Sequence, residues 1–262
     1  MGTNPQKKIL EVESLYKEYG KKENKTKALN GLSCSVLEGE FLGIMGSSGS
    51  GKTTLLNCIA TMIAPTDGRI LLNGEDISSF KGKRLAGYRG NQIGYLFQEF
   101  ELLDNLTGKE NIMLPMDIHG SAGNGEADRL EQLAEYLEIT SVLDKFPAQM
   151  SGGQKQRVAA ARAMILKPEI ILADEPTGSL DSKNARSLMD KLAGLNQIQH
   201  TTIMMVTHDA NAASYCSRIL FIQDGTIFHE LRRNFSEETQ RDFYERIIAV
   251  LAQLGGGSAN VY

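Results

Sequence analysis

The sequence predicts an α/β fold in which a parallel sheet is interrupted by a helical insertion. Three observations support this prediction. A buried strand leads through a glycine-rich turn into a helix over residues 41–60, short apolar strands alternate with helices from residue 170 to 230, and residues 100–167 have the polar pattern of helices. Strands that alternate with helices favour parallel pairing, because parallel strands need a crossover connection that is usually a helix.

The N-terminal third of the chain is predicted to consist mainly of strands joined by turns. Apolar runs or alternating patterns indicate strands over residues 9–19, 32–37, 41–45, 69–74 and 93–97. A charged turn is expected over residues 21–27, and Asn73–Gly74 is a hairpin turn signal.

The rest of the chain is predicted to alternate between helices and strands. Helices are expected over residues 107–114, 127–137, 151–166 and 182–196, and strands over residues 170–173, 202–206, 218–223 and 226–230. A last helix is expected to be capped by Ser236 and to carry the apolar stripe Phe243, Ile247, Leu251 and Leu254. Residues 255–262 are expected to be a frayed tail.

Composition excludes several classes of protein. The 262 residues are 41% hydrophobic and 23% charged, as in ordinary globular proteins, and the net charge of −4 gives no electrostatic footprint for nucleic acid. No apolar run is long enough to span a bilayer. The three cysteines, Cys34, Cys58 and Cys216, match no metal-ligand spacing and are expected to pack as small apolar residues.

A glycine-rich loop provides the strongest functional signal. It comprises Gly46, Ser47, Ser48, Gly49, Ser50, Gly51, Lys52, Thr53 and Thr54. Glycines let the backbone curl around a phosphate, and the following helix adds free N–H groups and the positive end of its dipole. In this P-loop pattern Lys52 is expected to reach the β- and γ-phosphates and Thr53 to ligate Mg²⁺. The loop therefore predicts a nucleotide site.

Two carboxylates follow the buried strand at residues 170–173. Parallel strands bind ligands at their carboxyl ends, so Asp174 and Glu175 are expected beside the P-loop. Asp174 suits Mg²⁺ coordination, and Glu175 is placed to orient or deprotonate an attacking water. The alternative is a strand that simply ends in solvated acids.

Ser151, Gly152, Gly153 and Gln154 open the helix at residues 151–166. A serine followed three residues later by glutamine is a capping box, which needs no function. Two successive glycines at a helix start are nevertheless unfavourable for the helix, and they leave backbone N–H groups open to an anion. The pattern favours a second phosphate-binding helix start.

These residues resemble the ATP-binding cassette (ABC) ATPases. The Ser-Gly-Gly-Gln segment looks like their signature motif, and further matches follow the order of the family over residues 8–230. They are Tyr19 for the aromatic that stacks on adenine, Gln98 for the Q-loop, Asp181 for the D-loop and His208 for the switch histidine. Met150 stands where leucine is usual, a volume-conserving difference.

The resemblance implies a fold and a mechanism. The fold is a P-loop NTPase (RecA-like) core with an antiparallel β subdomain and an inserted α-helical subdomain. Two copies are expected to face each other, each ATP lying between one P-loop and the partner's signature motif. The phosphates and Mg²⁺ would be held by Lys52, Thr53, Gln98 and Asp174. Glu175 would act on the attacking water, and His208 would contact the γ-phosphate. Asp181 can equally be a charge at a helix N-terminus. The other histidines, His119, His200 and His229, are expected to be structural or surface residues.

Finer matches resemble one branch of the family. The branch that contains the lipoprotein-release, macrolide-export and cell-division ATPases is similar to this chain over residues 97–107, 174–182 and 207–209. Within that branch, the bacitracin-type subfamily is similar to it over residues 43–50, 152–157, 213–222 and 231–254. This subfamily works with a large permease in antimicrobial-peptide resistance. The alternatives are a lipoprotein or macrolide exporter, a cell-division regulator, or a soluble cassette acting on DNA or ribosomes, which the acidic balance disfavours.

The resemblance also implies where a permease docks and how the chain divides. The docking surface is expected over residues 98–106, with Leu102, Leu103 and Leu106 either exposed there or packed inside the helical subdomain. Gly108 departs from the apolar residue usual at its position, which is expected to loosen the helix.

The ATPase domain is expected over 1–232 (core 1–97 and 168–232, helical subdomain 98–167), with a helical extension and tail at 233–262. The chain is expected in the cytoplasm, held on the inner face of the membrane by the permease.

Overall fold

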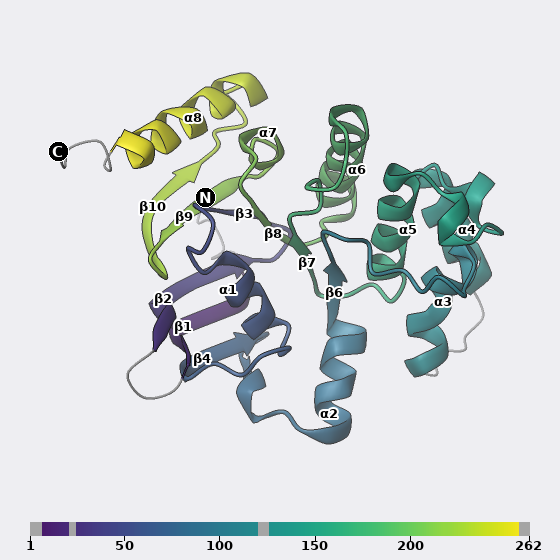
Figure 1. Cartoon of the computed structure of the whole chain (residues 1–262), viewed down its shortest axis with the longest axis horizontal. Coiled ribbons are helices and arrows are strands. Elements are labelled where there is room, and N and C mark those ends of the chain that lie inside the picture. The colour runs from purple at the N-terminus through teal and green to yellow at the C-terminus, as the bar shows by residue number, and fades with distance from the viewer. Residues whose placement is uncertain (1–6, 21–24, 120–125, 257–262) are drawn as a thin grey trace, which may run out of the picture.

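Two β-sheets organise the computed structural model, which describes residues 7–20, 25–119 and 126–256 (Figure 1). The larger sheet has the strand order β10-β9-β3-β8-β7-β6 and the smaller one the order β2-β1-β4-β5. The large-sheet strands are β3 (Phe41–Met45), β6 (Ile93–Leu96), β7 (Ile170–Asp174), β8 (Ile203–Thr207), β9 (Arg218–Gln223) and β10 (Thr226–Arg232). Those of the small sheet are β1 (Lys8–Tyr19), β2 (Thr26–Leu37), β4 (Asp67–Leu72) and β5 (Glu75–Asp76).

The large sheet is parallel except at one edge, as the alternation of strands and helices predicts. β3 pairs in parallel with β8 and β9, and β7 with β6 and β8, whereas β10 runs antiparallel to β9. Its central strands are continuous apolar runs because helices or the small sheet cover both of their faces. The small sheet is antiparallel throughout.

Helices enclose the large sheet on both sides. They are α1 (Lys52–Ile59), α2 (Gly82–Gly87), α3 (Gly108–His119), α4 (Glu126–Tyr136), α5 (Gly152–Met164), α6 (Ser182–Gln199), α7 (Ala210–Ala213) and α8 (Gln240–Gly256). Alternate residues of β3 face different cores: Leu42 and Ile44 pack in the cluster that holds α1 and the small sheet, and Phe41 and Met45 in the cluster that holds α3 to α8. The helices α3, α4 and α5 gather at one end of the molecule (Figure 1).

Several sequence-predicted boundaries were wrong. The helix expected over 107–114 continues through Pro115 to His119, and α6 runs to Gln199 rather than residue 196. Ser236 does not cap the last helix, because its hydroxyl turns back to donate to Asn234 Oδ1 and α8 begins only at Gln240. Residues 255 and 256 belong to α8 instead of a tail.

Some sequence predictions fall outside the described part of the chain. They concern the turn residues 21–24, the side chain of Leu254 and the tail residues 257–262. The short helices α2 and α7, and a π-helical turn over Tyr88–Gln92, had no counterpart in the sequence prediction.

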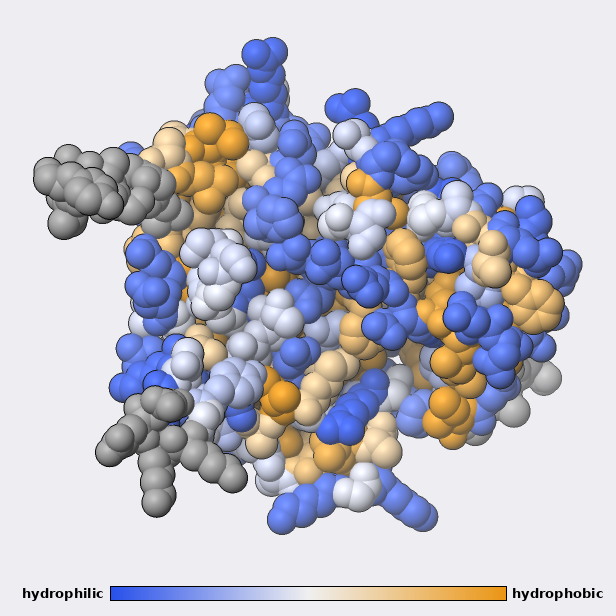
Figure 2. Space-filling model, viewed as in Figure 1, coloured by the Kyte–Doolittle hydropathy of each residue, from blue (hydrophilic) through white to orange (hydrophobic). Residues whose placement is uncertain are grey.

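The surface carries apolar residues over the terminal helix and over the helical end. Figure 2 shows hydrophobic residues gathered on α8, where Ile248 is 41% exposed, and more of them near α3, where Ile118 is 67% exposed. Within the described ranges, no helix has the length and apolar character needed to cross a bilayer.

Candidate active site

The parallel strands bring three sequence-predicted segments to one edge of the large sheet. β3 ends at Met45 and leads into the P-loop, β7 ends at Asp174, and β8 ends at Thr207 directly before His208. The register pairs Met45 with Thr207 and Asp174 with Val206, so these three strands end side by side. This is the edge at which open α/β sheets bind ligands.

The P-loop holds its lysine inside the loop. Lys52 is 6% exposed, and its Nζ donates to the carbonyl oxygens of Gly46 and Ser47, both at 2.9 Å. Burial lowers the pKa of the Lys52 ammonium, and the charges of Glu175 and Asp174 oppose that shift. Within the loop, the Lys52 ammonium is bonded only by neutral carbonyl groups. A phosphate group beside it would supply a full negative charge.

The start of α1 depends on glycine. Gly51 precedes the helix with φ +104°, and a Cβ there would lie 2.3 Å from the carbonyl oxygen of Ala28. Only glycine combines this conformation with such a close approach. The N-terminus of α1 is thereby presented to the same space as Lys52. In the described residues, the buried Ser50 Oγ has no hydrogen-bond partner.

Thr53 and Asp174 form the pair expected of a magnesium site. Thr53 Oγ1 donates to Asp174 Oδ1 at 3.1 Å, although the two residues are far apart in sequence. Burial raises the pKa of the Asp174 carboxyl, and the hydrogen bond from Thr53 opposes it. A hydroxyl and a carboxylate oxygen at bonding distance are hard oxygen ligands of the kind that Mg²⁺ selects, so these residues fit that ion.

Glu175 and His208 form a second pair. His208 Nδ1 lies 2.9 Å from Glu175 Oε2, and the Glu175 N–H donates to the carbonyl oxygen of Val206 at 2.9 Å. Glu175 has φ +45°, a left-handed conformation that is uncommon for a non-glycine residue. This backbone turn directs the Glu175 side chain away from the line of β7, and it is the kind of strain that clusters at functional sites.

A cleft of about 490 Å³ joins most of these residues. It is lined by Ala28, Gly46, Ser47, Ser48, Gly49, Gly51, Lys52, Thr53, Thr54, Glu175 and His208. Ten of these were predicted from the sequence, and Ala28, on β2, was not.

The four residues Ser151, Gly152, Gly153 and Gln154 do not line this cleft. Ser151 caps α5: its Oγ accepts from the Gln154 N–H, and Gln154 Oε1 accepts from the Ser151 N–H. Gly153 packs against α6, where a Cβ would lie 2.1 Å from Asn184 Oδ1. Asp181 caps α6 by accepting from the Lys183 and Asn184 N–H groups, which lowers the pKa of its carboxyl.

Gln98 and Tyr19 also lie outside the cleft lining. Gln98 is exposed, and its Nε2 lies 2.8 Å from where a Cβ on Gly178 would be. Tyr19 ends β1, is 43% exposed, and has Lys17 Nζ 5.2 Å from its ring centroid. An exposed ring at a strand end is available for stacking.

Two polar residues that sequence reasoning missed connect the site. Gln156, fully buried on α5, donates from Nε2 to the carbonyl oxygens of Phe97 and Pro176 at 2.9 and 2.8 Å. It therefore ties α5 to the segments beside Gln98 and Glu175. The Tyr95 hydroxyl lies 3.5 Å from Asp174 Oδ2. Gln156 lies in the segment 152–157 noted above, but neither its role nor that of Tyr95 has a local sequence signal, because their partners are distant in the chain.

Comparison with known proteins identifies the family. The model of the family described as "ABC transporter" matches residues 29–178, which include the P-loop, Ser151–Gln154 and both carboxylates. The chain belongs to the ABC transporter family. As an ABC ATPase it binds and hydrolyses ATP as the nucleotide-binding subunit of a bacterial transporter.

Similar proteins cover nearly the whole length of this ABC ATPase. Bacitracin export ATP-binding protein BceA of Halalkalibacterium halodurans is 47% identical over 95% of this chain and 97% of the relative. ABC transporter ATP-binding protein YxdL of Bacillus subtilis is 48% identical over 95% and 96%. Lipoprotein-releasing system ATP-binding protein LolD 1 of Rhodopseudomonas palustris is 38% identical over 84% and 98%.

A solved structure shares the fold. The ATP-binding cassette MJ0796, in a dimeric post-hydrolysis state bound to ADP and phosphate, superposes with a TM-score of 0.79. It is 37% identical, and the match covers 87% of this chain and 100% of that one.

Proposed function

We propose that this ABC ATPase closes into a homodimer around two ATP molecules and thereby drives a separate permease in antimicrobial-peptide resistance. The observation that carries the proposal is the division of the site. The P-loop, Glu175 and His208 share one cleft, whereas Ser151–Gln154 open another helix outside it. A second copy would supply the missing helix start, and the dimeric MJ0796 structure supports this arrangement.

The residues have distinct roles in this proposal. Lys52 and the P-loop N–H groups, including those of Ser47, Ser48 and Gly49, neutralise phosphate charge. Glu175 orients the attacking water or accepts a proton from it, and His208, 2.9 Å from Glu175, holds that carboxylate in place. Tyr19 stacks on the adenine, and the signature residues close from the partner copy.

Thr53, Asp174 and Gln98 would hold Mg²⁺. The ion supplies charge that stabilises the transferring phosphoryl group. Thr53 and Asp174 already lie within 3.1 Å of each other, so the oxygen ligands are in place before the nucleotide arrives. Gln98 would reach the ion from the segment that also faces the permease.

A groove beside residues 98–106 is the proposed permease contact. It has a volume of about 310 Å³ and includes Phe97, Glu101, Ile118, His119 and Arg162 in its lining. Of the three leucines expected there, Leu103 is 45% exposed, whereas Leu102 and Leu106 are only partly exposed. None of these leucines is in the groove lining, where the exposed apolar side chain is Ile118, 67% exposed. An exposed apolar side chain in a groove suits the apolar face of a partner helix.

Location and domain division belong to the same proposal. A subunit that binds a permease through this groove sits on the inner face of the membrane in the cytoplasm. The division into a core (1–97 and 168–232), a helical subdomain (98–167) and an extension (233–262) follows from the same resemblance.

The substrate proposal rests on likeness to named relatives. The relative from Halalkalibacterium halodurans is a bacitracin export protein and matches nearly end to end. A peptide antibiotic acting through the permease is therefore the proposed stimulus. The lipoprotein-releasing relative favours the second candidate, an exporter of lipoproteins.

Glu175→Gln tests the catalytic proposal. The amide keeps the shape of the side chain but cannot accept a proton, so ATP binding is expected to persist while turnover falls by about 10²- to 10⁴-fold. ATP should then hold the variant as a dimer, measured by size-exclusion chromatography with light scattering. Normal hydrolysis by this variant together with its permease contradicts the role of Glu175.

Peptide-stimulated ATPase activity tests the substrate. The complex with the permease, in lipid, is expected to hydrolyse ATP faster when bacitracin is added. Stimulation by a lipoprotein, with none by peptide antibiotics, selects the second candidate.

A further inference from the structure

The terminal helix α8 is anchored in the core next to α7. Phe243 and Ile247 are fully buried and belong to the same hydrophobic cluster as Ala210, Ala212 and Ala213 of α7. Removing two large apolar side chains from water stabilises the docked position of the helix. The helix therefore has a fixed position relative to α7.

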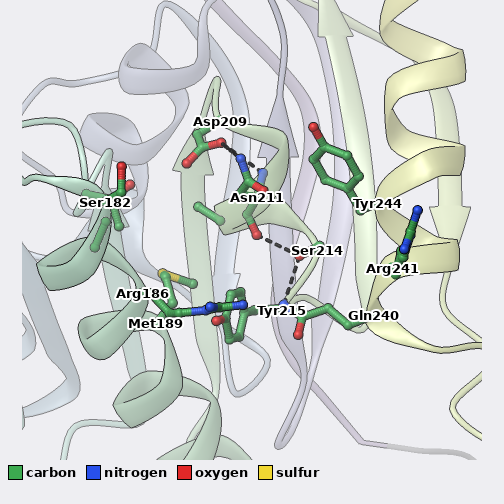
Figure 3. A pocket seen from close by; sticks show the side chains of 13 residues that line it. Ser182, Arg186, Met189, Asp209, Asn211, Ser214, Tyr215, Gln240, Arg241 and Tyr244 are labelled. Atoms are coloured by element: carbon green, nitrogen blue, oxygen red, sulfur yellow. Dashed lines mark hydrogen bonds between the residues drawn. The ribbon is translucent and has the colours of Figure 1, made fainter.

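Polar contacts continue from α8 to the start of α7. Gln240 Nε2 donates to Ser214 Oγ at 2.9 Å, and Ser214 Oγ donates to the carbonyl oxygen of Asn211 at 2.6 Å. The Asn211 N–H in turn donates to Asp209 Oδ1 at 2.8 Å, which caps α7 (Figure 3). Asp209 directly follows His208, so this chain of hydrogen bonds ends at the residue beside the switch histidine.

The same residues border a cleft. A cleft of about 480 Å³ lies between α6 and α8, with Arg186 and Met189 of α6 on one side and Gln240, Arg241 and Tyr244 of α8 on the other (Figure 3). Asn211 and Ser214 line this cleft as well. Across this cleft, α6 contacts the segment after α7 through the Tyr215 hydroxyl, which donates to Asp190 Oδ1 at 2.8 Å. The contact from α8 is instead made to Ser214, and it continues through Asn211 to Asp209.

We propose that α8 is a positioning element for the switch histidine: Gln240 holds α7 through Ser214, and α7 fixes the His208 side chain against Glu175. The proposal rests on the role given to His208 above and adds a role for the C-terminal extension. A shift of α8 would change the alignment of His208 and Glu175 without touching the P-loop. Misplacing a catalytic group by about 1 Å can slow a reaction by up to about a hundredfold, so a modest shift is sufficient.

Gln240→Glu in the full chain tests the proposal. The carboxylate cannot donate to Ser214 Oγ. Ser214 can keep the contact only by turning its proton from the Asn211 carbonyl to the carboxylate, so the chain of hydrogen bonds from α8 to α7 is broken in either case. We expect kcat for ATP hydrolysis to fall by about three- to tenfold, while KM for ATP stays within about twofold because the P-loop is unchanged. Arg241→Ala is the matched control, because Arg241 is the next residue on α8 and lines the same cleft, and its one ion pair among the described residues is with the exposed Glu245. It is expected to leave kcat unchanged.

A double-mutant cycle with His208→Ala separates positioning from a general structural effect. If Gln240 acts through His208, Gln240→Glu slows the His208→Ala enzyme no further. An equal slowing in both backgrounds, or a rise in KM with kcat unchanged, overturns the proposal. Normal turnover by His208→Ala alone contradicts instead the role given to His208, which distinguishes the two failures.

Discussion

At the residue scale, the ionised carboxylate of Asp174 lowers the stability of the folded protein. Burial raises the pKa of its carboxyl, mainly because the charged form is removed from water, and Glu175 acts in the same direction. A group whose folded pKa lies above its unfolded value stabilises the protein at low pH, and that contribution is lost as the pH rises through the folded pKa. At neutral pH the ionised Asp174 is therefore destabilising.

We expect Asp174→Asn to raise the melting temperature of the nucleotide-free protein at pH 7. The gain should shrink as the pH falls through the raised pKa of Asp174, and it should be absent below the unfolded value of about 3.9. Thermal melts across this range measure it. A lower melting temperature at pH 7 than that of the wild type contradicts the prediction.

Asp181→Asn is the matched control with the opposite sign. Hydrogen bonds from the backbone and side chain of Asn184 lower the pKa of Asp181, so its charged form stabilises the fold above its unfolded pKa. This substitution is expected to lower the melting temperature at pH 7, with a loss that disappears as the pH falls through the lowered pKa of Asp181.

The residues with a local spacing pattern were predictable, and those without one were not. Lys52, Thr53 and His208 lie in short motifs that follow strands, and the parallel register brings them together. Gln156 and Tyr95 act through partners dozens of positions away, so only the folded chain reveals them. Long-range contacts of single polar side chains leave no periodic trace in a sequence.

At the scale of elements, α5 and α6 explain the second glycine of the signature segment. Sequence reasoning attributed both glycines to open N–H groups, but a Cβ on Gly153 would also lie 2.4 Å from Asn184 Cγ. Asn184 is not free to move away, because its Nδ2 donates to Asp181 Oδ2 at 2.6 Å. Gly153 therefore serves the packing of two helices as well as any ligand.

Gly153→Ala is expected to destabilise the protein by about 1–3 kcal/mol, the usual range for overpacking. Gly152→Ala is the control, since its nearest neighbour would be Phe100 Cζ at an ordinary 3.7 Å. Chemical denaturation measures both variants. The double variant Gly153→Ala, Asn184→Ala should regain most of the loss, and a Gly153→Ala protein as stable as the wild type contradicts the clash.

Element boundaries were predictable only where local signals agreed. Ser236 was the predicted cap of the last helix, but Asp242 accepts from the Thr239 N–H and hydroxyl, so the helix begins after Thr239. Gly108 was expected to loosen its helix. In the fold it is buried, its N–H donates to the Lys145 carbonyl, and a Cβ would lie 2.7 Å from the carbonyl oxygen of Val142. Packing, rather than flexibility, accounts for this glycine.

At the scale of the whole molecule, the parallel core followed from the sequence and the arrangement of the sheets did not. Alternating strands and helices predict parallel strands, but β1 pairs with the distant β4 as well as with its neighbour in the chain, β2, and β3 lies between β8 and β9. Such pairings depend on how apolar faces combine in three dimensions. The site is similar in this respect. The P-loop and the segment Ser151–Gln154 can both be recognised in the sequence, but only the fold shows that they lie apart.

That separation leads to a prediction about two copies of the chain. Lys52→Ala removes the P-loop ammonium, and Ser151→Arg places a bulky charge at the exposed start of α5. If each ATP lies between the P-loop of one copy and the signature segment of the other, neither variant traps ATP alone. A mixed dimer nevertheless contains one site with an intact P-loop and an intact signature segment. Random pairing makes half of the dimers mixed, so about a quarter of wild-type sites should be restored.

Both variants should carry Glu175→Gln so that bound ATP is retained during the measurement. They are mixed in equal amounts with radiolabelled ATP, and the ATP that co-elutes with the dimer on size exclusion is counted. The Glu175→Gln protein alone gives the full value, and each double variant alone gives the background. Trapping near a quarter of the full value supports completion of the site by the partner copy. Trapping no greater than background in the mixture shows that each copy completes its own site. Trapping by the Ser151→Arg variant alone shows instead that the signature segment does not complete the site at all.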